Sequence, residues 1–179
     1  MQLCTFDIYN FKNMNQVSIN KSIHLSEHFT LGEVTKSSHA EIYNIPSHVV
    51  IENLKRMCSW LEELRFTYNS LYCLKPGEDY ETSKDVEPII INSGYRSPEL
   101  NKKVGGSTTS NHLTGCAVDI RVAGIEQALR YAVILMDYAD ETKQDYDEIL
   151  IEKNSHGAIW LHLAVRPKDN RRKTMFIYK

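Results

Sequence analysis

The chain has 179 residues, of which 42% are hydrophobic and 25% are charged. This length and composition are typical of a single globular domain and exclude an intrinsically disordered chain. The formal net charge of −2 gives no overall positive field, so we expect no nucleic-acid partner. We also expect no membrane span, because no segment approaches the roughly 18 consecutive apolar residues that a span needs. The first residues contain no apolar signal-peptide core.

The first half of the chain predicts an arm followed by helices. Residues 1–22 are polar and rich in asparagine, and we expect them to form an edge strand or a loosely attached arm ahead of one domain over residues 23–179. Thr30 and Glu33 have the spacing of a capping box, which predicts a short helix. The longest helix is expected from Pro46–Ser47 onward, because apolar residues recur there at steps of three and four.

The second half of the chain predicts strands and two further helices. Residues 89–97 are expected to run as a strand into a turn, and Pro98 then opens a short helix that closes at Gly105–Gly106. Residues 124–139 predict a long amphipathic helix. Three strands are expected after it, over residues 146–152, 158–165 and 174–179. The order of these elements predicts an α+β fold in which helices pack on one side of an antiparallel sheet.

The stretch SNHLTGCAVDI, residues 110–120, places a carboxylate in a segment that otherwise predicts a buried strand. A buried carboxylate is costly unless it is paired or binds a metal. By strand alternation Asp119 shares a face with the small Ala117, which leaves room for an approaching group. Gly115 lets the chain turn sharply, so His112 and Asp119 can converge on one point. Imidazole nitrogen and carboxylate oxygen are both ordinary zinc ligands.

A third candidate ligand lies in the strand predicted over residues 158–165. His162 is the only ionisable side chain in that segment, and alternation places it on a face with Trp160 and Ala164. A histidine in a strand can also be a core residue that is hydrogen-bonded to backbone. The small neighbour and the central strand favour a ligand.

Three ordered motifs, SGYRSPELN, SNHLTGCAVDI and WLHLAV, together resemble the zinc peptidases of the M15 group. This group contains D-alanyl-D-alanine carboxypeptidases and related peptidoglycan endopeptidases, and it shares its fold with the Hedgehog signalling domain. The resemblance covers about residues 25–166 and is greatest to a short subgroup found in bacteria and their phages. The family pattern Ser-x-His-x-x-Gly-x-Ala-x-Asp followed by Trp-x-His is met at Ser110, His112, Gly115, Ala117, Asp119, Trp160 and His162.

The resemblance implies a zinc ion held by His112, Asp119 and His162, with a fourth position left for water. It also implies that Arg96 binds a substrate carboxylate through two parallel hydrogen bonds, although an arginine in a turn can simply be solvated. Ser110 either orients the substrate or only caps the turn before His112.

The chain departs from the family at the general base. Many M15 enzymes carry an acid three residues before the last histidine ligand, where this chain has Ile159. We expect Glu152 to replace it, provided that the strand register turns this side chain toward His162, because a slip of one residue would reverse its face. A glutamate at the exposed edge of a loop is the other interpretation. His156, in the following loop, is an alternative catalytic residue that would stabilise an oxyanion.

Two functions follow from these features. The first is a zinc-dependent peptidase that hydrolyses a D-amino-acid-containing bond in peptidoglycan stem peptides, as a carboxypeptidase or endopeptidase. The alternative, which the missing acid at Ile159 favours, is a catalytically weak or inactive zinc-containing module that binds the cell wall or a peptide. For either function we expect a monomer that is made in the cytoplasm and acts on the cell wall after release.

The remaining charged and thiol side chains are expected to be structural. The basic segment over residues 166–173 predicts a solvated turn more than a contact with anionic wall polymers. Cys58 and Cys116 are expected to be small buried thiols, and no disulfide framework is expected.

Overall fold

A computed structural model of the chain describes residues 9–11 and 17–179, and residues 1–8 and 12–16 are not described. Strands β1 (Tyr9–Phe11) and β2 (Val17–Ile19) pair antiparallel and form a small sheet of their own. The expected N-terminal arm lies partly outside the described residues, and its described strands do not join the main sheet.

The helices are α2 (Leu31–Thr35), α3 (His48–Tyr72), α4 (Pro98–Lys103), the 3-10 helix η1 (Asn111–Thr114) and α5 (Ile125–Thr142). The α-helices begin where the sequence predicts, whereas η1 lies where only a turn was expected. The capping box is present, because the backbone N–H of Glu33 donates to the Thr30 hydroxyl and the Glu33 carboxylate accepts from the Thr30 N–H. Ser47 and Ser97 cap α3 and α4 through their hydroxyl oxygens, which accept from the backbone N–H groups of Val50 and Leu100. None of the helices in the described part of the chain is long and apolar enough to cross a membrane.

The main sheet has five strands in the order β3-β4-β6-β5-β7. The strands are β3 (Ile91–Ser93), β4 (Ala117–Arg121), β5 (Glu148–Lys153), β6 (Ile159–Ala164) and β7 (Lys173–Tyr178). The predicted α+β class is confirmed, but the sheet is mixed, because β7 runs parallel to β5 while the other pairs are antiparallel. The segment 165–172 leaves β6 beside Glu148 and only has to pass the start of β5 to begin β7. The last strand therefore runs antiparallel to β6 and parallel to β5.

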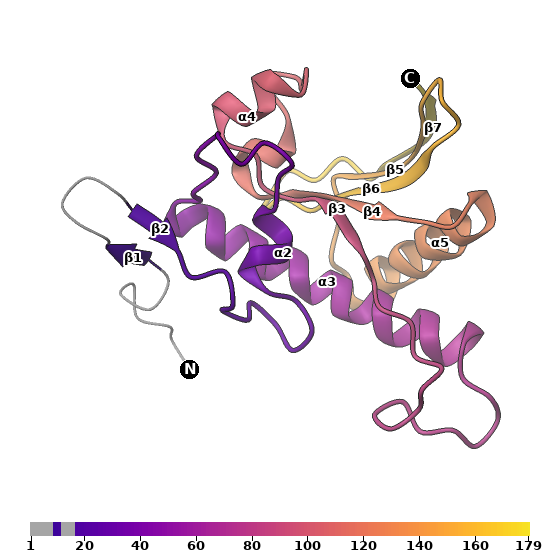
Figure 1. Cartoon of the computed structure of the whole chain (residues 1–179). Coiled ribbons are helices and arrows are strands. Elements are labelled where there is room, and N and C mark those ends of the chain that lie inside the picture. The colour runs from indigo at the N-terminus through magenta and orange to yellow at the C-terminus, as the bar shows by residue number, and fades with distance from the viewer. Residues whose placement is uncertain (1–8, 12–16) are drawn as a thin grey trace.

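The two faces of the sheet differ in chemistry. One face packs on α3 and α5, which lie side by side below the strands (Figure 1). The apolar strand residues of the core are on this face, and they include Val118, Ile120, Ile149, Ile151, Leu161 and Leu163. Because side chains alternate along a strand, the intervening residues point away from these helices. Hydrophobic burial therefore fixes which side chains are left for the opposite face.

The described cysteines are free thiols. Cys58 in α3 and Cys116 before β4 are buried, as expected, and Cys73 is partly exposed. Burial raises the pKa of the Cys58 thiol to about 12. Cys4 lies outside the described residues.

Candidate metal centre

The strand register brings Asp119 and His162 together. Asp119 of β4 pairs directly with His162 of β6, and His162 pairs on its other side with Leu150 of β5. Paired residues share a face, so all three side chains point away from the helices. By the same alternation Glu148 and Glu152 lie on this face.

His112 reaches the same point from η1. The Ser110 hydroxyl accepts a hydrogen bond from the His112 N–H at 3.3 Å, and η1 ends at Gly115, whose φ of 71° is left-handed. The His112 Nδ1 donates to the Gly94 carbonyl oxygen at 2.6 Å. This bond turns Nε2 toward Asp119, and Nε2 lies 3.4 Å from Asp119 Oδ2.

The three side chains could hold a metal ion. One ligand atom from each of His112, Asp119 and His162 lies within 4.8 Å of the others, and all three residues are buried. His162 presents Nδ1 to Asp119 Oδ1 at 2.9 Å and turns Nε2 toward Glu148. Two imidazole nitrogens and one carboxylate oxygen are a donor set that suits a transition-metal ion such as zinc. The residues present therefore fit a metal.

The three residues also form a strongly coupled electrostatic group. Burial alone would raise the pKa of Asp119, but the two histidines outweigh it and hold that pKa far below its usual range. Burial would lower the pKa of His162, but the hydrogen bond with Asp119 and the nearby Glu148 carboxylate raise it to about 9. The pKa of Glu148 falls to about 2, chiefly because of its interaction with His162. The carboxylates are thus ionised and are balanced by nearby positive charge.

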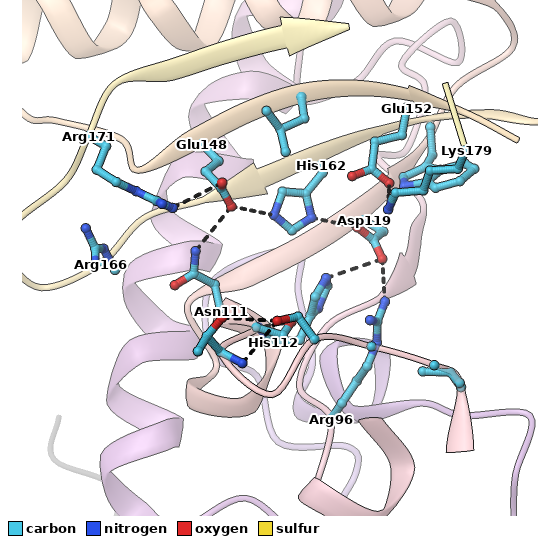
Figure 2. A pocket seen from close by; sticks show the side chains of 18 residues that line it. Arg96, Asn111, His112, Asp119, Glu148, Glu152, His162, Arg166, Arg171 and Lys179 are labelled. Atoms are coloured by element: carbon cyan, nitrogen blue, oxygen red, sulfur yellow. Dashed lines mark hydrogen bonds and ion pairs between the residues drawn. The ribbon is translucent and has the colours of Figure 1, made fainter. Parts of the chain in front are cut away.

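The group lies in a cavity of about 740 Å³. Figure 2 shows His162 between two acids, with Asp119 on one side and Glu148 on the other. The charged residues that line the cavity are Arg96, Asp119, Glu148, Glu152, Arg166, Arg171 and Lys179. The cavity therefore offers cations around a buried cluster of carboxylates and imidazoles.

The structure brings most of the predicted site residues into this cavity. Arg96 is not a solvated turn residue: its Nη2 donates to Asp119 Oδ2 at 2.6 Å and its Nε donates to the Ser93 hydroxyl at 2.9 Å. Ser110 both caps η1 and lines the cavity. Glu152 is buried, lines the cavity and forms an ion pair with Lys179, so it is not an exposed loop glutamate.

His156 is the exception. It is exposed in the turn between β5 and β6 and is not among the residues that line the cavity. Its Nδ1 lies 3.3 Å from the Ser155 hydroxyl, and its backbone N–H donates to the Asn154 side chain. The tight turn holds this loop at the end of the hairpin. The structure therefore does not support the predicted role of His156 in stabilising an oxyanion.

Sequence reasoning missed the partners of the basic segment. Arg166 and Arg171 form ion pairs with Asp147, whose side chain is fully buried, and Arg171 also contacts Glu148. The segment is therefore packed against acids and is not a freely solvated turn. Alternation along residues 146–152 does place Glu148 on the same face as Glu152, but the sequence gives no signal for the cations that reach it.

Comparison with known proteins agrees with this geometry. A family model described as Peptidase M15 matches residues 78–142. This segment is therefore similar to the M15 peptidases. The M15 segment includes Arg96, His112 and Asp119, while His162 lies beyond it and is brought to the same centre by the sheet. No curated protein matches the chain.

Proposed function

We propose that the protein is a zinc-dependent peptidase that hydrolyses a D-amino-acid-containing bond in peptidoglycan stem peptides. The observation that carries this proposal is the convergence of His112, Asp119 and His162 in one cavity with the carboxylate of Glu152, in a chain that matches the M15 peptidases. A structural metal site would have four protein ligands, whereas three ligands and an open cavity are typical of a catalytic site.

The three ligands would hold the metal through His112 Nε2, a carboxylate oxygen of Asp119 and His162 Nδ1. Zinc bound there would polarise a scissile carbonyl and lower the pKa of water, which is the usual chemistry of zinc hydrolases. Arg96 holds Asp119 from the side opposite His162, so that carboxylate has a fixed orientation before any metal binds.

Glu152 is the residue that we assign to proton transfer. It would take a proton from the attacking water and return it to the leaving amine, which is the usual work of a general base and acid. Ile159 has no group that can do this. Glu152 pairs with Trp160 across the β5–β6 hairpin, two positions from His162, so the register compensates for the acid that is missing at Ile159. Lys179 holds its carboxylate at the cavity wall.

Arg96 and Ser110 are assigned to the substrate. A guanidinium binds a carboxylate through two parallel hydrogen bonds, and stem peptides carry carboxylates at their ends and on their side groups. The further cations at the rim, Arg166, Arg171 and Lys179, favour an anionic peptide in the same way. Such a substrate places the site of action at the cell wall, which the protein would reach after release from the cytoplasm.

The test compares zinc-loaded wild-type protein with Glu152→Gln on purified muropeptides, with products identified by mass spectrometry. We expect Glu152→Gln to keep its zinc and to lose about 10²–10⁴-fold in turnover, because the amide has a similar shape but is not basic. Glu141→Gln removes an exposed acid from α5 and should leave turnover unchanged. If the zinc-loaded wild type cleaves no stem peptide, the peptidase proposal is wrong and the binding module is favoured.

A further inference from the structure

In each candidate histidine ligand, the ring nitrogen that faces away from the metal position meets a different kind of group. His112 donates from Nδ1 to the neutral carbonyl of Gly94, which leaves Nε2 for a metal. His162 presents Nδ1 to Asp119, and its outer nitrogen, Nε2, lies 3.6 Å from Glu148 Oε2. A ligating imidazole carries its proton on the nitrogen that does not bind the metal, so the proton of His162 would point at the Glu148 carboxylate.

Glu148 is itself held by groups from two other parts of the chain. Lys173 Nζ lies 3.3 Å and Arg171 Nη2 lies 3.1 Å from its Oε1. Asn111 Nδ2 donates to Oε2 at 3.4 Å. The carboxylate is therefore fixed both by the segment that follows β6 and by η1, which carries His112 (Figure 2).

Arg171, one of the two cations that hold Glu148, is fixed in turn by Asp147, which also binds Arg166. Arg171 Nη2 lies 2.6 Å from Asp147 Oδ2, and Arg166 Nη2 lies 2.8 Å from Asp147 Oδ1. The Asn111 amide also donates to Asp147, at 2.8 Å. Because the Asp147 side chain is fully buried, this network has few other arrangements available. A solvated turn would leave Arg171 and Lys173 free to move.

We propose that Glu148 is a positioning residue for the metal ligand His162, and that the segment Arg166–Lys173 is a clamp that holds Glu148 in place. Carboxylates behind a ligating histidine fix its tautomer and ring orientation and strengthen its binding to the metal. Arg171 and Lys173 bind Oε1 and so restrict rotation of the Glu148 side chain, which keeps Oε2 directed at His162. The inference rests on the metal site of the proposed function but not on catalysis.

The experiment measures zinc affinity in a competition with a chromophoric chelator, using full-length wild type, Glu148→Ala, Glu148→Gln and Glu152→Gln. Removal of such an outer carboxylate typically weakens metal binding by about 10–100-fold, and we expect this loss for Glu148→Ala. Glu148→Gln should lose less, because its amide oxygen still accepts the His162 proton. Glu152→Gln makes the same isosteric change on the same face of β5 and should bind zinc like the wild type. Arg171→Ala should shift the affinity in the same direction as Glu148→Ala.

A second readout separates positioning from a general loss of structure. The visible absorption of the cobalt(II)-loaded proteins reports the geometry of the ligands, and it should change in Glu148→Ala and not in Glu152→Gln. Urea unfolding of the metal-free proteins shows whether each variant is folded at the start. Unchanged zinc affinity and an unchanged cobalt spectrum in Glu148→Ala would overturn the positioning role alone. A wild type that binds zinc but cleaves no peptide would overturn only the proposed peptidase function, and one that binds no metal would overturn both.

Discussion

Gly115 is the residue at which one added methyl group should displace η1, the helix that carries His112, from its place against α3. It ends η1 with a left-handed φ of 71°, three residues after His112. A Cβ atom at this position would lie 2.8 Å from Val50 Cγ1 and 2.9 Å from the Val50 carbonyl oxygen. It would also lie 3.1 Å from Leu54 Cγ. Gly115→Ala therefore combines an unfavourable backbone conformation with a collision against α3.

Gly105 provides the matched control. Its φ of 72° is almost the same, but no atom lies within 4 Å of the Cβ that alanine would add. The left-handed conformation costs an L-residue about 1–2 kcal/mol, and alanine regains about 0.4–1 kcal/mol by restricting the unfolded chain. We therefore expect Gly105→Ala to lower the free energy of unfolding by at most about 1.5 kcal/mol. Overpacking typically adds about 1–3 kcal/mol, and that addition is expected for Gly115→Ala alone.

The assay is urea unfolding of both metal-free variants and the wild type, followed by zinc titration of each. Because the Val50 backbone in α3 cannot retreat easily, we expect Gly115→Ala to move η1 and so to weaken zinc binding as well. Gly105→Ala should bind zinc like the wild type. If the two variants lose the same stability, the collision with α3 is absent and the argument from close packing is wrong.

Three further predictions test separate parts of the structure. Arg96→Ala should keep its zinc, because a cation beside Asp119 competes with the metal. It should lose at least about 10–100-fold in kcat/KM for stem peptides, because each charge-assisted hydrogen bond lost costs about 1.5–3 kcal/mol, and undiminished cleavage would contradict the carboxylate role. Asp147→Asn should lower the free energy of unfolding in urea by about 1.5–3 kcal/mol, because it removes the charge from a buried acceptor of hydrogen bonds from Arg166 and Arg171. A loss below about 0.5 kcal/mol would show that solvent replaces these contacts. Cys58 should resist iodoacetamide at pH 8 until urea unfolds the chain, because its thiol has a pKa of about 12 and no exposed surface. If mass spectrometry finds Cys58 labelled in the native protein, its burial is refuted.

Local sequence signals predicted the α-helices and singled out the candidate metal ligands because the forces involved act over a few residues. Capping by Thr30 and Ser47, and the apolar period of α3, depend only on neighbours along the chain. The alternation that placed Asp119 toward the cavity is equally local. The family resemblance then supplied what local signals lack, which is that two distant strands carry ligands for one site.

The features that the sequence left open or missed depend on pairing between distant segments. A one-residue slip would have turned Glu152 into the core, and only the observed pairing of Glu152 with Trp160 decides its face. The parallel pairing of β7 follows from where the chain leaves β6, which strand propensity does not encode. Arg171 carries no mark in the sequence that distinguishes a solvated cation from one bound to Asp147. His156 was placed near the site only because it is close to His162 along the chain.

The position of β6 in the sheet explains how the site is assembled. The M15 match ends at residue 142, before β5 and β6 begin. The chain then inserts β6 between β4 and β5, so His162 has an acid-bearing strand on each side. Asp119 on β4 shares the candidate metal with it, and β5 supplies Glu148 behind its ring and Glu152 at the cavity wall. If β6 lay at an edge of the sheet it would have only one neighbouring strand. His162 would then lie beside Asp119 or beside Glu148 and Glu152, but not beside both. The strand order therefore sets the chemistry of the site as directly as the ligands do.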